Sequence, residues 1–116
     1  MSAWVRVAPR AELAPGEVRA VALARDELGR PREALVLLAE DGEPRAYLNR
    51  CQHLPIPLDG GSRVFLDAEG RHLRCGTHGA LYRVRDGLCI DGPCPGKVLI
   101  ALPWRVVDGW IEIEDR

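Results

Sequence analysis

The sequence predicts an all-β fold, and three observations support this. The apolar segments are short, and 12 Gly and 9 Pro separate them. Helical periodicity is weak throughout, and the best helical candidate, residues 10–13, is cut short by Pro15 and Gly16. Aspartate–glycine pairs, which favour tight turns, recur between the apolar segments. Many short strands joined by such turns favour an antiparallel sandwich or barrel.

The expected strands follow one another closely along the chain. Near the start, Val5 and Val7 alternate with Trp4 and Arg6, as in a half-buried strand. The segment 34–39 is continuously apolar and compatible with a strand. The complete set of expected strands is 4–7, 18–23, 34–39, 45–49, 64–66, 72–75, 81–84, 98–102, 104–107 and 110–113. Turns are expected at 41–42, 67–70, 86–87 and 108–109.

The composition is that of an ordinary globular domain. The 116 residues are 47% hydrophobic and 28% charged, with a formal net charge of -1. The charges are spread along the chain, which argues against a nucleic-acid-binding surface or a polybasic membrane arm. No apolar stretch is long enough to span a bilayer, and no secretory signal is visible. We therefore expect a single cytoplasmic domain with no membrane or nucleic-acid partner.

Four cysteines are the most informative residues. A disulfide scaffold requires a secreted context, which the sequence does not indicate, so metal binding is the better interpretation. Two short motifs carry it, Cys51-Gln52-His53 and Cys75-Gly76-Thr77-His78, separated by the 21 residues 54–74. Each follows an expected strand, so both belong to loops at strand ends. Such loops side by side would bring two thiolates and two imidazoles together.

This ligand set favours an iron–sulfur cluster. Thiolates suit such clusters, and two imidazoles in place of two thiolates reduce the negative charge and raise the reduction potential, to roughly -150 to +300 mV. The same four residues, Cys51, His53, Cys75 and His78, could bind Zn²⁺ tetrahedrally. Zinc modules, however, favour Cys-x₂₋₄-Cys pairs, whereas here each loop has one cysteine and one histidine.

The two motifs resemble the cluster-binding boxes of the Rieske ferredoxin family. The second box extends over residues 75–82, and residues 4–7 and 91–95 resemble that family's first strand and proline loop. The resemblance implies one all-β domain over 1–116, with three stacked antiparallel sheets. It also implies a cluster-binding subdomain, about 50–95, formed by two hairpin loops. One [2Fe–2S] cluster would bind there, with Cys51 and Cys75 on the inner iron and His53 and His78 on the outer iron.

Departures from the high-potential members of the family narrow the subtype. Those proteins have a further cysteine in each loop, where this chain has Ile56 and Thr77, so their disulfide cannot form. They also have a serine that bonds a cluster sulfide, where this chain has Ala80. Fewer hydrogen bonds to sulfur lower the potential, so we expect a midpoint below about +100 mV. Tyr82 matches the family's aromatic position, and its hydroxyl would donate to a cysteine sulfur.

Other candidate residues have simpler interpretations. On a strand leading into Cys75, His72 points away from the cysteine face, so a surface role is expected. Cys89 and Cys94 are expected to be small buried thiols, with a redox disulfide as the alternative. The apolar run 54–58 is expected either to exclude water from the cluster or to dock a partner. The arginines of strands near the second box are expected to form a solvated face or to steer an acidic partner: Arg71, Arg74, Arg83 and Arg85.

The resemblance implies an electron carrier. Such ferredoxins pass single electrons from a flavin-dependent reductase to a terminal oxygenase. An oxygenase catalytic subunit would need two further histidines for a second iron site, and only His72 remains. The chain is therefore expected not to be an enzyme by itself. Two alternatives stay open, an accessory subunit similar to the small subunit of assimilatory nitrite reductase, and a zinc-binding interaction module. The donor, the acceptor and the oligomeric state stay open as well.

Overall fold

The computed structural model describes residues 3–51, 56–60, 62–76, 79–93 and 95–115. These residues form three antiparallel sheets and one short 3₁₀ helix, so the prediction of an all-β fold is confirmed. The elements are β1 (Ala3–Pro9), η1 (Arg10–Glu12), β2 (Arg19–Leu23), β3 (Arg32–Leu38), β4 (Pro44–Leu48), β5 (His72–Arg74), β6 (Leu81–Arg83), β7 (Cys89–Asp91), β8 (Trp104–Val107) and β9 (Trp110–Asp115).

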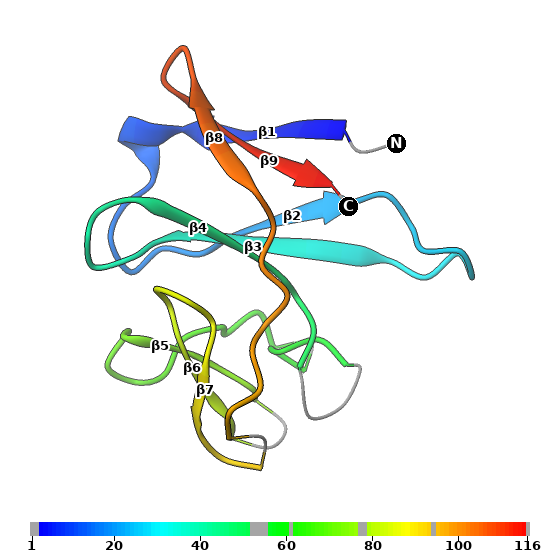
Figure 1. Cartoon of the computed structure of the whole chain (residues 1–116), viewed down its shortest axis with the longest axis vertical. Coiled ribbons are helices and arrows are strands. Elements are labelled where there is room, and N and C mark those ends of the chain that lie inside the picture. Colours follow the sequence, from blue (N-terminus) through cyan, green and yellow to red (C-terminus); the bar gives the residue numbers. More distant parts are fainter. Residues whose placement is uncertain (1–2, 52–55, 61, 77–78, 94, 116) are drawn as a thin grey trace.

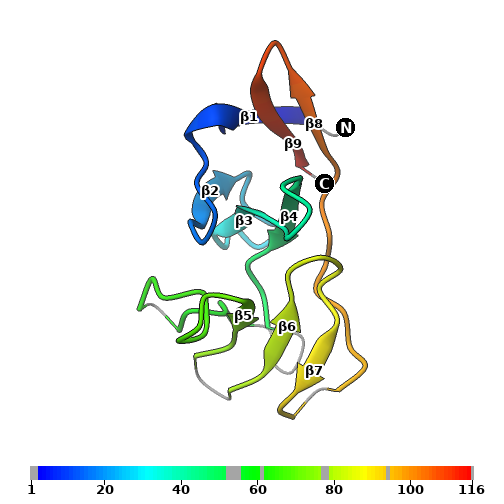
Figure 2. The same ribbon diagram turned by 90° about the vertical axis from the view of Figure 1, so that its left-hand side faces the viewer.

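The three sheets are stacked along the long axis of the molecule (Figure 1). The sheet β1-β9-β8 lies at one end, β2-β3-β4 lies in the middle, and β5-β6-β7 lies at the other end. The chain enters the last sheet after β4 and returns along the segment between β7 and β8, as the rotated view also shows (Figure 2). In the sequence, the small sheet is therefore inserted between β4 of the middle sheet and β8 of the first sheet.

Strand β3 explains the continuously apolar stretch seen in the sequence. Because side chains of a strand alternate between its faces, β3 contributes to two cores. Ala34 and Val36 pack between the first two sheets, whereas Leu35 and Leu37 pack toward the small sheet. All four side chains are buried. The middle sheet is therefore covered on both faces, which removes the polar residues expected at alternate positions of a solvent-facing strand.

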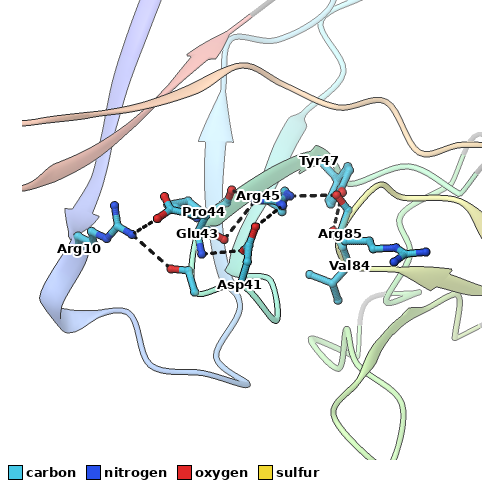
Figure 3. Close-up of polar contacts among 9 residues, drawn as sticks. Arg10, Asp41, Glu43, Pro44, Arg45, Tyr47, Val84 and Arg85 are labelled. Atoms are coloured by element: carbon cyan, nitrogen blue, oxygen red, sulfur yellow. Dashed lines mark hydrogen bonds and ion pairs between the residues drawn. The ribbon is translucent and has the colours of Figure 1, made fainter.

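The β3–β4 hairpin attaches the small sheet through polar contacts (Figure 3). The hydroxyl of Tyr47 donates to the carbonyl of Val84 at 2.6 Å, and Nε of Arg45 donates to the carbonyl of Arg85 at 2.9 Å. Burial raises the pKa of Tyr47 to about 12, so its hydroxyl stays protonated at neutral pH and remains a donor. These bonds tie β4 to the turn that follows β6.

The expected hairpin between 64–66 and 72–75 forms only in part, because 64–66 is not a continuous strand. Only Leu66 forms a bridge, with Leu73, although the turn after it closes as expected through a bond from Gly70 N–H to Asp67 O. The backbone N–H of Val64 donates to the hydroxyl of Ser62 at 3.2 Å rather than to a strand. Two backbone bonds flank the bridge, from Arg74 N–H to Phe65 O at 2.8 Å and from Asp67 N–H to His72 O at 2.9 Å, so the pairing with β5 is confined to a single bridge.

The expected strand at 98–102 is also absent as a continuous element. Val98 bridges Leu88 in the small sheet, whereas Ala101 bridges Tyr47 in the middle sheet. The segment changes partner halfway, so no single ladder forms. Strand β7 was not predicted, and it follows the expected turn at 86–87. The candidate helix at 10–13 is only the 3₁₀ turn η1, and within the described residues no helix has the length and hydropathy required to cross a membrane.

Candidate metal centre

The structure places two of the four predicted ligands in one core. Cys51 lies shortly after β4, and Cys75 directly follows β5. Their side chains are 1% and 0% exposed, and both belong to the core between the middle and small sheets. His53 and His78 lie outside the described residues. The expectation that both motifs begin where a strand ends is confirmed.

The two cysteines begin loops that close in the same way. Cys51 N–H donates to Ile56 O at 2.8 Å, and Cys75 N–H donates to Ala80 O at 2.8 Å. In both cases the acceptor is five residues after the cysteine. A second bond, from Gly79 N–H to Cys75 O at 2.8 Å, tightens the second loop. The matching closures place each cysteine at the start of a segment whose sixth residue accepts its N–H.

The loops are joined through the backbone of Leu58. Its carbonyl accepts a bond from Gly76 N–H at 2.7 Å, and its side chain is fully buried. A β-carbon at Gly76 would lie 3.3 Å from Asp59 O and 3.5 Å from Leu58 O. Glycine at this position therefore permits the close approach of the two loops.

Tyr82 on β6 supplies a polar contact to the first cysteine. Its hydroxyl lies 3.6 Å from Cys51 Sγ, and the tyrosine is fully buried. An ionised sulfur accepts but does not donate, so toward a metal-bound thiolate the hydroxyl is the donor. Two buried thiols from closely joined loops, with a hydroxyl directed at one sulfur, fit the donor set of an iron–sulfur cluster.

The remaining candidates have structural contacts. His72 Nδ1 lies 3.1 Å from Asp67 Oδ2, which confirms its surface role. Desolvation raises the pKa of Asp67, but hydrogen bonds from the backbone of Arg71 and from His72 outweigh it and hold that pKa below its ordinary value. Cys89 is buried, and its Sγ donates to the carbonyl of Asp91 at 3.2 Å. Cys94 lies outside the described residues.

Charged residues near the loops divide into paired and exposed groups. Arg83 forms an ion pair with Asp86, and Arg71 lies 4.0 Å from Glu69. Arg74 is exposed at the end of β5. The apolar run after the first motif is also divided, since Leu58 is buried while Pro57 is exposed. Leu58 is therefore a candidate for excluding water from the cluster, and Pro57 is a candidate for contact with a partner.

Two contacts of the site could not be predicted from the sequence pattern. Asn49 accepts the N–H of Leu58 through its side-chain oxygen at 2.8 Å, although asparagine after a strand usually indicates only a turn. Gly92 presses against Ala80 in the second loop, where a β-carbon would lie 2.6 Å from the Ala80 Cα. Both contacts join segments far apart in the sequence.

Comparison with known proteins places this geometry in a family. A model of the Rieske [2Fe-2S] domain matches residues 3–104. The oxygenase component of chloroacetanilide N-alkylformylase from Rhizorhabdus wittichii is 37% identical over 92 residues, which cover 79% of this chain and 23% of that protein.

Solved structures agree on the fold. The terminal oxygenase of carbazole 1,9a-dioxygenase from Novosphingobium sp. KA1 matches with a TM-score of 0.72 and 26% identity, covering 95% of this chain and 29% of the other. The corresponding oxygenase from Nocardioides aromaticivorans IC177 matches with a TM-score of 0.69 and 28% identity, with the same coverage. This chain spans less than a third of the length of each of these three relatives. It belongs to the Rieske family, whose domain binds one [2Fe–2S] cluster and transfers electrons.

Proposed function

We propose that this protein is a low-potential electron carrier that passes single electrons from a flavin-dependent reductase to a terminal oxygenase or similar acceptor. Its ligands are Cys51, His53, Cys75 and His78, within a single domain over residues 1–116 whose cluster-binding subdomain spans about 50–95. The observation that carries the proposal is the pair of buried cysteines, which lie in one core and whose N–H groups each bond the carbonyl five residues later.

The described residues have distinct parts in this function. When bound, the cluster accepts and releases one electron at a time. Cys51 and Cys75 provide thiolate ligands from a buried position. Leu58 lies between the two loops and excludes water, because its side chain is fully buried and its carbonyl bonds the second loop. The hydroxyl of Tyr82 stabilises negative charge on Cys51 Sγ.

The first test is the metal content and colour of the intact chain. After anaerobic reconstitution we expect two iron atoms and two acid-labile sulfides per chain, as the [2Fe–2S] family requires. The protein should be red-brown, with a midpoint potential below about +100 mV. A colourless protein that retains zinc would contradict the proposal and favour the zinc-binding module.

The second test follows the electron. NADH and a flavin-dependent reductase should reduce the loaded chain, and the reduced chain should then support turnover by a terminal oxygenase from which its own ferredoxin has been removed. Apoprotein is the control, because it has the same amino-acid sequence without the redox group. Reduction without onward transfer would contradict a carrier role.

A second function has a specific observation in its favour. The relatives are oxygenase components, and this chain matches less than a third of their length. The domain would then deliver electrons within an oxygenase rather than shuttle between proteins. Failure of the loaded chain to supply a separate oxygenase, together with normal reduction by the reductase, is the result that this alternative predicts.

Replacing Tyr82 with phenylalanine is expected to lower the midpoint potential. The change removes the hydroxyl that lies 3.6 Å from Cys51 Sγ. A hydrogen bond that is about 1 kcal/mol stronger in the reduced state raises the potential by about 40 mV, because 59 mV corresponds to about 1.4 kcal/mol for one electron. Protein-film voltammetry of the loaded chain measures this shift.

Tyr47→Phe is the matched control. This tyrosine is also buried in the same core, but its hydroxyl donates to the carbonyl of Val84. The control should lower the melting temperature and leave the potential at its wild-type value. Equal potentials for the Tyr82 variant and the wild type would show that the hydroxyl does not act on the cluster.

A further inference from the structure

A continuous chain of hydrogen bonds runs from the middle sheet to the second cysteine loop. It starts at Glu33 on β3, whose carbonyl accepts the N–H of Asn49 at 2.8 Å and whose carboxylate accepts from Asn49 Nδ2 at 2.9 Å. The side-chain oxygen of Asn49 then accepts from Leu58 N–H at 2.8 Å. The carbonyl of Leu58 accepts from Gly76 N–H at 2.7 Å.

The two ends of this series of hydrogen bonds lie next to the two cysteines in the sequence. Asn49 precedes Cys51 by two residues, and Gly76 follows Cys75 directly. Through its N–H and its carbonyl, Leu58 therefore connects Asn49, just before the first cysteine, with Gly76, just after the second. Two successive bonds, each 2.8 Å or shorter, separate the Asn49 amide from the second loop. A shift of the amide would alter the relative position of the two loops.

Arg63 fixes the carboxylate of Glu33, the first residue in this series of hydrogen bonds. Its guanidinium donates two bonds to the Glu33 carboxylate, at 3.0 and 3.1 Å, in a bidentate arrangement. Its backbone N–H donates to Asp59 Oδ2 at 3.0 Å, which anchors it beside Leu58. With a φ of 62°, Arg63 has a left-handed backbone that is strained for a non-glycine residue. Surrounding contacts must therefore stabilise this conformation.

We propose that Glu33, Asn49 and Arg63 form a positioning brace that sets the separation of the Cys51 and Cys75 loops, and through it the stability and redox properties of the cluster. The proposal rests on the proposed function, since it concerns how the same ligands are held. None of the three residues is a ligand. They act through Leu58, whose N–H donates to Asn49 just before the first loop and whose carbonyl accepts from Gly76 in the second loop.

The brace differs from an ordinary stabilising ion pair. The side chains of Glu33 and Arg63 are 27% and 57% exposed, so solvent screens their attraction and the pair contributes little to folding stability. Its loss should hardly change the melting temperature. Residues that orient metal ligands, in contrast, typically affect metal affinity by about 10–100-fold. Cluster retention and stability therefore separate a positioning role from a structural one.

The experiment compares loaded Asn49→Ala and Glu33→Gln variants with the wild type. Cluster loss is followed by visible absorbance during challenge with an iron chelator, and the midpoint potential and electron paramagnetic resonance spectrum are recorded for each protein. We expect Asn49→Ala to lose its cluster about tenfold faster, with a displaced potential and altered g-values. Glu33→Gln should shift all three in the same direction by less, with a melting temperature close to wild type.

Glu43→Gln is the matched control. Glu43 also pairs with an arginine, Arg10, at 2.7 Å, and its carbonyl accepts the N–H of Ala39 within the β3–β4 hairpin; in the part of the chain that the structure describes, these contacts lie away from both cysteine loops. It should resemble wild type in release rate, potential and spectrum. Glu33→Gln also keeps the test decisive if Asn49→Ala does not fold, because the exposed pair contributes little to stability.

Two failures are distinguishable. If the wild type takes up no iron and sulfide, both the proposed function and the brace are overturned. If the wild type loads normally while Asn49→Ala and Glu33→Gln release the cluster at its rate and keep its potential, the brace alone is overturned. A lowered melting temperature with unchanged potential and g-values would likewise assign these residues a purely structural role.

Discussion

Cys75→Ser is expected to fold with its secondary structure intact and to bind almost no iron. Serine is close to cysteine in size, so it fits the fully buried site and preserves the N–H bond to Ala80 O. Its hydroxyl, however, remains protonated at neutral pH, whereas iron–sulfur clusters require thiolate ligands. Iron and sulfide content should fall to near background, with circular dichroism close to that of the wild-type apoprotein.

Cys89→Ser is the matched control for this substitution. Cys89 is 2% exposed, and its Sγ donates to Asp91 O at 3.2 Å, a bond that a serine hydroxyl also makes. The control should load with wild-type amounts of iron and sulfide. Full loading of Cys75→Ser would contradict the ligand assignment, and loss of loading in Cys89→Ser would place Cys89 among the ligands.

Gly92→Ala is expected to destabilise the protein more than other single-methyl additions. The added β-carbon would lie 2.6 Å from Ala80 Cα and 3.0 Å from Ala80 N, both backbone atoms of a fully buried residue. Because the backbone has a φ of +98°, alanine is also strained at this position. The two effects together cost about 3 kcal/mol, which lowers the melting temperature by about 10 °C.

The clash also reaches the metal centre. Ala80 closes the second cysteine loop by accepting the N–H of Cys75 at 2.8 Å. Moving Ala80 to admit the methyl group would therefore displace Cys75. Besides the melting temperature, we expect a faster loss of visible absorbance from the loaded protein during chelator challenge. Differential scanning calorimetry and absorbance spectroscopy measure the two effects.

Gly96→Ala separates backbone strain from the clash. Gly96 has a φ of +82°, but a β-carbon there meets no atom within 4 Å. We expect this control to cost only about 1–2 kcal/mol, the strain alone. If Gly92→Ala and Gly96→Ala lower the melting temperature equally, contact with Ala80 does not determine the effect.

Much of the fold could be predicted because its signals are local. Short apolar segments with glycine-containing turns indicated strands, and the structure confirms the all-β class and most strand positions. The segments 64–66 and 98–102 form isolated bridges rather than continuous strands, the first beside a local side-chain bond and the second because its two bridges go to different sheets. Their residues are suited to strands, but Val64 N–H bonds the Ser62 hydroxyl and Val98 and Ala101 bridge different sheets. Strand propensity does not specify which partner is available.

The candidate site was predictable to the level of residue type and spacing. One cysteine and one histidine in each of two loops indicated an iron–sulfur cluster, and the family comparison agrees. The structure adds that Cys51 and Cys75 are buried in one core. The roles of all four residues as ligands stay a prediction, which Cys75→Ser tests for one of them.

By itself, the sequence determined the fold class, the two motifs and the chemistry that their residue types favour, because these depend on neighbours along the chain. Only the tertiary structure decided how the loops are held. Burial of β3 on both faces, the bonds from Glu33 through Asn49 and Leu58 to Gly76, and the contact of Gly92 with Ala80 all join distant segments. Such contacts arise when the sheets stack, and no local pattern specifies them.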